Sequence, residues 1–126
     1  MPTPALLVMH PGLEDQLLDP VVRRRLGCVV DLVSDTAVGD QAGLVELDRL
    51  EGVEVLVTGW GCPPLDAEVL DRLPELRFMA HAAGTMRGIV TDVLWERGIT
   101  VTSAAAANAV PVAEFTFAAI VMLGKD

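Results

Sequence analysis

The sequence predicts an α/β domain built on a five-stranded parallel sheet with helices on both faces. Five short apolar runs, rich in β-branched residues, recur at intervals of about 24 residues, and helix-capping residues stand between them. Hydrophobicity is nearly continuous within each run rather than alternating, which is typical of strands buried on both faces. Strand, helix and strand at this spacing predict right-handed β-α-β units, and hence a doubly wound parallel sheet.

The five runs are expected to form strands that all point the same way. In chain order they are ALLVMH from Ala5, CVVDLV from Cys28, VEVLVTG from Val53, RFMAHAA from Arg77 and ITVTSA from Ile99. Because the carboxyl ends of parallel strands meet at one edge of a sheet, the residues that follow each run are expected to share that edge.

Capping residues mark two helices in the first part of the chain. Asp19-Pro20 opens a helix that ends at Gly27, since aspartate is a good N-cap and proline fits the first helical turn. Asp66 is expected to cap the next helix, and Pro74 is expected to stop it.

A third helix is predicted between the last two strands. Thr91 is its expected N-cap, and Gly98 is the residue expected just after its end. The signal is weakest over residues 39–50, which we interpret as a loop followed by a short helix over Leu44–Leu50.

Composition excludes several classes of protein. The chain has 18 acidic and 9 basic residues, a net charge of −9, and 52% apolar residues, with a mean hydropathy of +0.46. This hydrophobicity excludes intrinsic disorder. A net-acidic chain repels phosphate unless basic residues are segregated, and the only basic cluster is Arg23-Arg24-Arg25. We therefore expect no nucleic-acid partner.

Cysteine usage and the N-terminal residues indicate a cytoplasmic protein without a metal site. Cys28 and Cys62 belong to no CxxC or CxxH pattern, so neither a disulfide framework nor a zinc site is expected. Residues 1–9 lack the basic start and the long apolar stretch of a signal peptide. The apolar residues 104–124 are numerous enough to cross a membrane, but Glu114 among them would cost about 3 kcal/mol there. We expect no membrane insertion.

The candidate site lies in the loops that follow the strands, because open α/β sheets bind ligands beyond the carboxyl ends of their strands. Small residues dominate three of these loops, at residues 58–62, 81–85 and 103–108. Small residues let backbone N–H groups approach an anion closely. They also permit tight turns in the absence of any ligand, and the residues alone favour that simpler interpretation.

Three side chains in these loops are candidate site residues. His81 ends the fourth strand and points near the site, although a structural, half-buried histidine is the favoured alternative because no carboxylate lies close in sequence to orient it. Trp60 is interpreted either as a wall of the pocket or as a lid on the core. Asn108 is the third, and an N-cap at Asn108 with Pro111 in the first helical turn fully explains it without a ligand.

Motifs of several ligand-binding proteins are absent from the sequence. Gly59-Trp60-Gly61 begins like a dinucleotide-binding fingerprint, but Pro63-Pro64 stands where the third glycine and the start of a helix belong. No GxxxxGK[ST] phosphate-binding loop is present. His10-Pro11 follows the first strand, where a phosphorylated receiver domain needs acidic residues and a flavodoxin needs a Ser/Thr-rich loop.

The second half of the chain carries a series of motifs in a recognisable order. After the strand at Arg77 come a small-residue loop, a helix ending in Arg97-Gly98-Ile99, another strand, and Asn108-Ala109-Val110-Pro111-Val112-Ala113-Glu114, which opens a long helix. With this spacing, residues 76–123 resemble the D-isomer-specific 2-hydroxyacid dehydrogenase family. Residues 1–75 match only in architecture, and Leu65–Arg77 is the most similar piece among them.

The resemblance implies a flavodoxin-like fold and the substrate-binding, or catalytic, lobe of an NAD(P)-dependent oxidoreductase that interconverts a 2-hydroxy acid and a 2-oxo acid. It implies that the backbone amides of Ala83, Gly84 and Thr85 hold the substrate carboxylate, and that Asn108 lies at the active site. The family has an aspartate where this chain has Arg87, which is either a new anion contact or a plain surface charge.

The resemblance also divides the chain and implies what would follow it. Residues 1–107 correspond to the substrate-binding domain, and residues 108–126 to an interdomain helix that leads into a Rossmann domain. In the family that second domain supplies the NAD or NADP site and the catalytic arginine, acidic residue and histidine. We therefore expect this chain to bind no cofactor, to carry no catalytic residue and to be inactive alone.

The final helix predicts a partner. Apolar residues surround it on nearly every side between Val110 and Leu123, and a helix of this kind is usually buried on all faces. We expect a homodimer that forms through this helix, because an exposed apolar patch of this size normally finds a partner. The alternative to a dehydrogenase lobe is a free-standing flavodoxin-like module that binds a small acid or regulates another protein.

Overall fold

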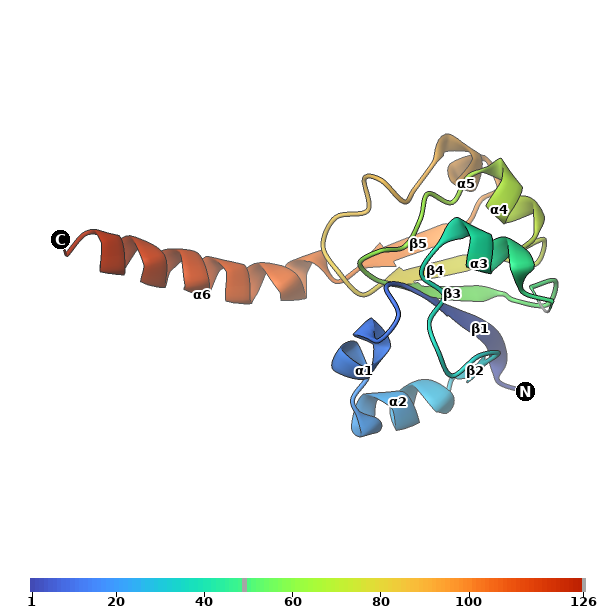
Figure 1. The fold of residues 1–126 in the computed structure, drawn as a ribbon, viewed down its shortest axis with the longest axis horizontal. Helices are drawn as coiled ribbons and strands as arrows, with labels where there is room; N and C mark the ends of the chain where they lie inside the picture. Colours follow the sequence, from blue (N-terminus) through green and yellow to red (C-terminus); the bar gives the residue numbers. More distant parts are fainter. Residues whose placement is uncertain (49, 126) are drawn as a thin grey trace.

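The computed structural model, which describes residues 1–48 and 50–125, contains the expected parallel sheet. The order of the strands is β2-β1-β3-β4-β5, and every neighbouring pair is parallel. Each predicted run overlaps one strand, so the fold class is confirmed (Figure 1). The strands are β1 (Thr3–Val8), β2 (Val30–Leu32), β3 (Val55–Thr58), β4 (Phe78–His81) and β5 (Thr100–Ser103).

Helices flank the sheet on two sides, and one more projects away from it (Figure 1). Leucines of α1 and α2 pack on one face of the sheet, and leucines of α3, α4 and α5 pack on the other. In the described part of the chain the helices are α1 (Leu13–Leu17), α2 (Pro20–Gly27), α3 (Gln41–Glu46), α4 (Ala67–Asp71), α5 (Asp92–Glu96) and α6 (Ala105–Leu123).

The three helices predicted from capping residues are confirmed. The side chain of Asp19 accepts hydrogen bonds from two backbone N–H groups at the start of α2, both at 2.8 Å. Asp66 and Thr91 each accept one from the third residue after them. Gly98 follows α5 with a φ of 69°, the left-handed conformation that glycine adopts without strain.

A short helix occurs in the region predicted over Leu44–Leu50, but the predicted bounds are wrong, because α3 spans Gln41–Glu46. Helix α3 begins at Gln41, because the Asp40 side chain accepts a hydrogen bond from the N–H of Gly43 at 2.6 Å. The backbone is already extended at Leu47, and Arg49 lies outside the described residues. Leu44 and Leu50 are both buried, so the chain contacts the core before and after this turn. Helix α1 was not predicted.

Helix α6 begins earlier than predicted, and Asn108 is not its N-cap. The first helical residue is Ala105, and the N–H of Asn108 already donates to the carbonyl of Ala104 at 2.8 Å. Pro111 therefore lies inside the helix rather than in its first turn. Alanine has the highest helix propensity, so the alanine run extends the helix toward the sheet without a capping side chain.

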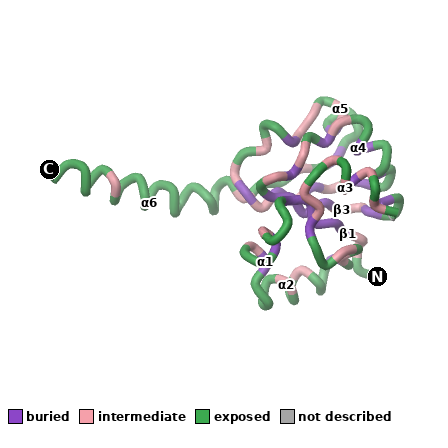
Figure 2. The backbone as a smooth tube through the Cα atoms, in the orientation of Figure 1, coloured by how far each residue is buried: buried purple, intermediate pink, exposed green. Residues whose placement is uncertain are grey.

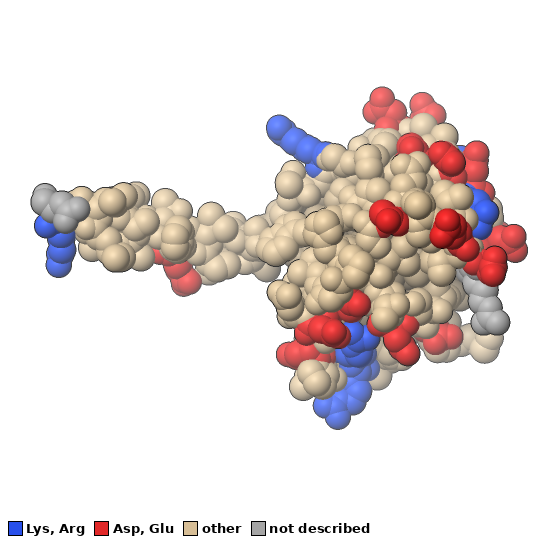
Figure 3. Space-filling model, viewed as in Figure 1, with Lys and Arg blue, Asp and Glu red and all other residues tan. Residues whose placement is uncertain are grey.

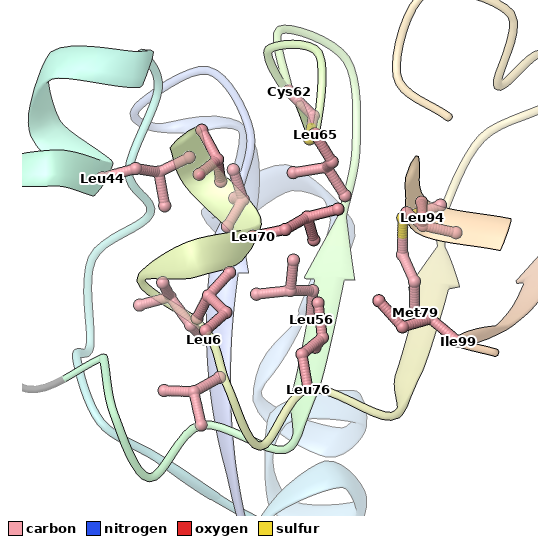
Figure 4. Packing of buried hydrophobic residues seen from close by; sticks show 14 of the residues in the cluster. Leu6, Leu44, Leu56, Cys62, Leu65, Leu70, Leu76, Met79, Leu94 and Ile99 are labelled. Atoms are coloured by element: carbon pink, nitrogen blue, oxygen red, sulfur yellow. The ribbon is translucent and has the colours of Figure 1, made fainter. Parts of the chain in front are cut away.

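Most of the core lies between the sheet and helices α3–α5. Leu70 of α4 packs with Leu6 and Leu56 on the strands, and Leu94 of α5 lies close to Met79 of β4 (Figure 4). A smaller cluster joins the other face of the sheet to α1 and α2. Burial of these side chains, at about 25 cal/mol per Å² of apolar surface, is the main force that holds the layers together.

The last strand and the last helix are among the most exposed parts of the molecule (Figure 2). No residue of α6 is buried, and three of the four residues of β5 are exposed. The expectation that the strands are buried on both faces is therefore wrong for β5, because no helix covers its second face. By length and composition α6 could also cross a membrane, the only helix of the described residues to pass that test.

Candidate functional site

The carboxyl ends of four strands form one row, as the strand directions require. Val8, Thr58, His81 and Ser103 are paired across β1, β3, β4 and β5 in the same register. Thr58 and His81 lie side by side and are both buried. The loops that leave this row are the ones in which the sequence places the candidate site.

The loop after β4, residues 82–85, is hydrogen-bonded on one side to β3 and on the other to the residue that precedes α6. The N–H of Ala82 donates to the carbonyl of Thr58 at 2.7 Å, and the N–H of Ala104 donates to the carbonyls of His81 and Ala83 at 3.0 and 3.1 Å. The backbone N–H groups of Ala83, Gly84 and Thr85 donate no hydrogen bond to any described residue. These three donors lie on a loop of fixed position, in which Ala83 is buried and Thr85 is exposed; successive backbone N–H groups without a protein partner can bind an anion.

Asn108 lies against this loop. A Cβ atom on Gly84 would come 3.3 Å from Nδ2 of Asn108, which is closer than most real Cβ contacts. Since α6 starts at Ala105, Asn108 lies in its first turn, next to the loop. The structure therefore brings Gly84 and Asn108 together, and glycine leaves room for the amide group.

His81 is the last residue of β4 and directly precedes the loop. Its side chain is only 3% exposed, and Nδ1 lies 2.8 Å from the hydroxyl oxygen of Thr58. Nε2 makes no hydrogen bond with a described residue. Burial lowers the pKa of His81, and the backbone of Thr85 opposes this to a smaller extent. The imidazole is consequently neutral at pH 7, and its bond to Thr58 fits the structural role favoured from the sequence.

Trp60 lies on the surface beside the loop after β1. Its side chain is 58% exposed, which does not fit a lid on the core. The carbonyl of Trp60 accepts a hydrogen bond from the N–H of His10 at 2.8 Å. Gly61 has a φ of 90°, and a Cβ atom there would overlap the imidazole ring of His10. These contacts join Trp60 to the loop after β1 rather than to residues 82–85.

Arg87 is exposed and makes no ion pair with a described residue. Its backbone N–H donates to the hydroxyl of Thr85 at 3.4 Å, so the residue follows the loop closely. Cys62, in the loop between β3 and α4, is buried, and burial raises the pKa of its thiol to about 12. Neither side chain has the surroundings of a nucleophile or a general base.

Glu14 is a buried acid that sequence reasoning missed. Its side chain is 4% exposed, and Oε1 accepts a hydrogen bond from the N–H of Ala37 at 3.2 Å. Burial acts to raise the pKa of Glu14, but hydrogen bonds from backbone N–H groups, helped by the charge of Arg23, lower it below its usual value. The available signal was its spacing, because Glu14 stands four residues before Leu18, which is buried just after α1.

The Gly59-Trp60-Gly61 loop does not have the geometry of a dinucleotide-binding loop. Gly61 is followed by Pro63 and Pro64, and α4 begins only at Ala67, so no helix N-terminus faces the glycine loop. The space above Gly61 is filled by His10 rather than left open for a pyrophosphate. No group of three His, Cys, Asp or Glu side chains suited to a metal ion occurs among residues 1–48 and 50–125.

One known family matches most of this chain. The family model for the D-isomer specific 2-hydroxyacid dehydrogenase catalytic domain matches residues 18–120. The chain belongs to this family. The resemblance of residues 76–123 is thereby confirmed, and it extends into the first half of the chain. No curated protein matches the sequence.

Solved structures of dehydrogenases share the fold. A phosphoglycerate oxidoreductase from Rhizobium etli is 26% identical, with a TM-score of 0.70 over 98% of this chain and 36% of its own. A pyruvate reductase of Chlamydomonas reinhardtii (15% identical, TM-score 0.61) and a phosphoglycerate oxidoreductase from Vibrio cholerae O395 (23%, 0.51) share the fold over 82% of this chain. The match covers 29% of the first of these two chains and 31% of the second. This member of the family thus spans about a third of the length of these dehydrogenases.

Proposed function

We propose that this chain is the substrate-binding lobe of an NAD(P)-dependent oxidoreductase that interconverts a 2-hydroxy acid and a 2-oxo acid. The observation that carries the proposal is the set of three unpaired backbone N–H groups at Ala83, Gly84 and Thr85. They lie on a loop fastened between β3 and the start of α6, in a chain of the 2-hydroxyacid dehydrogenase family.

The loop would bind the carboxylate that all 2-hydroxy and 2-oxo acids share. Backbone N–H groups stabilise a negative charge without a counter-charge that would itself need solvation. Asn108 adds an amide beside Gly84, within reach of a ligand on the loop. His81 is a positioning residue, because its bond to Thr58 fixes the strand end from which the loop departs.

The hydride transfer itself belongs to a part of the enzyme beyond this chain. Members of the family are generally NAD-dependent, and the dehydrogenase structures extend to about three times the length matched here. We propose that residues 1–107 form the substrate domain and residues 108–126 the interdomain helix. In this division the chain alone binds no NAD or NADP, contributes no catalytic residue and is inactive. We also propose a cytoplasmic protein without nucleic-acid or membrane partners.

We further propose that the chain forms a homodimer through α6. The helix carries apolar side chains on all sides and none of its residues is buried, so water contacts a large apolar surface. Surfaces of this kind in soluble proteins are usually interfaces.

Titration of the 126-residue chain with D-lactate, followed by the amide signals in NMR spectra, tests the carboxylate site. We expect weak binding, on the order of 1 mM or weaker, that shifts the signals of residues 83–85. Methyl D-lactate, which lacks the charge, should leave them in place. Shifts confined to other loops, or equal shifts with the ester, would show that this loop is not the site.

A pair of glycine variants sharpens the test. Gly84→Ala places a methyl group against Asn108 and should reduce lactate binding several-fold. Gly88→Ala is the matched control, because a Cβ atom at Gly88 meets nothing within 4 Å. Equal affinity in both variants would contradict the proposed placement of the ligand.

A further inference from the structure

The pair formed by Thr58 and His81 is a polar interruption of the core between the sheet and helices α3–α5. The two residues stand two positions after Leu56 and Met79, which belong to this core, and successive side chains of a strand point to opposite faces of the sheet. Thr58 and His81 therefore lie on the same face as this core, at the carboxyl ends of their strands. The other buried residues of the core are apolar, and a buried polar atom without a partner costs free energy, so the pair has a role other than packing.

The imidazole of His81 has one nitrogen that is hydrogen-bonded and one that is not. Nδ1 shares a hydrogen bond of 2.8 Å with the hydroxyl of Thr58, whereas Nε2 is buried without a partner among the described residues. The backbone of Thr85 lies close enough to the ring to favour its protonated form, which is the effect of a carbonyl acceptor and not of an N–H donor. The ring is therefore close to the backbone of the loop that carries the free N–H groups.

Thr58 can serve either charge state of this imidazole. A threonine hydroxyl rotates, so it donates to a ring nitrogen that carries no proton and accepts from one that does. The neutral ring leaves Nε2 without a hydrogen bond. An imidazolium would donate from both nitrogens, from Nδ1 to the hydroxyl of Thr58 and from Nε2 to the carbonyl of Thr85. The hydrogen-bonding groups around the ring thus suit the charged form, and what that form lacks is a counter-charge.

The described residues do not supply this counter-charge. Acidic side chains are spread over the surface of the sheet domain (Figure 3). Glu14, the only buried acid among them, lies with α1 on the opposite face of the sheet, and the Cys62 thiol stays neutral because its pKa is about 12. Asp66 accepts hydrogen bonds from the backbone of α4 and from Gln41. The other charged residues on α4–α6 and on the loops after β3, β4 and β5 are exposed: Glu68, Asp71, Arg87, Asp92, Glu96 and Glu114.

We propose that His81 takes up a proton from solvent when an acid binds to the loop at residues 82–85. The carboxylate of the acid supplies the missing counter-charge, and the imidazolium donates to Thr58 and to the carbonyl of Thr85. The positive charge beside the loop strengthens the binding of the anion in turn, so that protonation and binding favour each other. This inference rests on the proposed carboxylate site. It assigns His81 as a positioning residue that makes the affinity for an ionised acid depend on pH.

Titration of the full 126-residue chain with D-lactate at pH 7.5 and at pH 5.5, followed by the amide signals of residues 83–85, tests the proton uptake. D-lactate stays ionised over this range, because the pKa of a carboxyl group is about 4. We expect the dissociation constant to be lower at pH 5.5 by about threefold or more. The ring signals of His81 report the same linkage, since saturating D-lactate should raise the pKa of His81 and methyl D-lactate should leave it unchanged.

Variants of the pair assign the effect to the imidazole and its partner. His81→Asn should bind D-lactate with the same affinity at both pH values. Thr58→Val keeps the shape of the side chain but removes the hydroxyl that accepts from the imidazolium, so the difference between the two pH values should shrink. Thr58→Ser retains the hydroxyl and should retain the difference. His10→Asn is the control for the histidine, because His10 is exposed and should not contribute.

The outcomes separate this inference from the carboxylate site. Shifts at residues 83–85 with one affinity at both pH values, or a pH dependence that persists in His81→Asn, would overturn the proton uptake and leave the carboxylate site in place. An absence of shifts at residues 83–85 at both pH values would overturn the carboxylate site and the proton uptake together. Where a variant does not fold, the ring signals of the unmodified chain decide, because a His81 pKa that D-lactate does not change also overturns the proposal.

Discussion

At the scale of single residues, the pair formed by Thr58 and His81 does most to define the candidate site. The two side chains are buried at neighbouring positions of β3 and β4, and their hydrogen bond of 2.8 Å connects the ends of these strands. The loop with the free N–H groups starts directly after His81. A neutral imidazole suits this place, because a buried positive charge would require a counter-charge that the described residues do not supply.

The lowered pKa of His81 predicts a pH-dependent stability. Below the unfolded-state pKa of about 6.5, the unfolded chain binds a proton that the folded chain still excludes. The free energy of unfolding should therefore fall as the pH drops from 6.5 through the lower folded pKa, by at most about 1.4 kcal/mol per pH unit from this residue. Urea unfolding at several pH values between 7.5 and 5 measures it.

Two variants identify the histidine responsible. His81→Asn keeps a polar side chain that does not titrate, so it should be less stable at pH 7.5 but lose less stability on acidification. His10→Asn is the control, because His10 is exposed at the loop after β1. An unchanged pH slope in His81→Asn would refute this assignment. Glu14 does not interfere, because its lowered pKa affects stability only below about pH 4.5.

At the scale of elements, Thr91 links two helices that cover the main core. Its hydroxyl donates to the carbonyl of Leu65, just before α4, at 2.6 Å. The same oxygen accepts from the N–H of Leu94 in α5. Arg97 adds a second link, because its guanidinium donates to the carbonyl of Leu70 at 2.7 Å. These bonds hold α4 and α5 side by side over β3 and β4.

Thr91→Val removes both hydroxyl bonds while keeping the shape of the side chain. We expect it to lower the free energy of unfolding by about 2 kcal/mol, since a buried acceptor and a helix N–H both lose their partner. Thr91→Ser retains the hydroxyl and should cost less than about 1 kcal/mol. The urea midpoints of the two variants give the comparison. Equal midpoints would mean that the methyl group contributes as much as the hydroxyl, which would contradict the role given to the two hydrogen bonds.

Elements whose signals are local could be predicted from the sequence. Asp19, Asp66 and Thr91 cap helices through bonds to residues two or three positions ahead, so a short pattern contains the whole interaction. The predicted start of α6 at Asn108 is wrong, because the helix propensity of the alanine run lets the helix begin at Ala105 without a polar N-cap. The loop at residues 82–85 could be placed at a strand end, but the bond between Thr58 and His81 depends on strand register, which no local pattern encodes.

At the scale of the whole molecule, the chain combines a complete sheet with an incomplete outer layer. Helices α3–α5 pack on one face, whereas the other face is only partly covered over β3–β5, and no residue of α6 is buried. A doubly wound sheet is usually covered on both faces, because bare apolar strands cost free energy in water. The positive hydropathy of this acidic chain therefore reflects surfaces that are suited to a partner as well as a core.

The geometry of the Gly59–Gly61 loop predicts that the 126-residue chain does not bind NAD or NADP. The only Gly-x-Gly segment holds His10 against Gly61 and is followed by two prolines, so no helix N-terminus and no open glycine loop are present to take a pyrophosphate. Titration with NADH, followed by the fluorescence of the exposed Trp60 and Trp95, should show no saturable change up to about 1 mM, a concentration at which even a weak site would fill appreciably. An intact NAD-dependent dehydrogenase run in parallel confirms that the assay detects binding. Saturable binding that Trp60→Phe alters would place a cofactor site on this lobe and contradict the proposed division of the enzyme. If NADH does not bind and lactate shifts the signals of residues 83–85, the result supports a division of the enzyme in which this lobe recognises the substrate and another lobe recognises the cofactor.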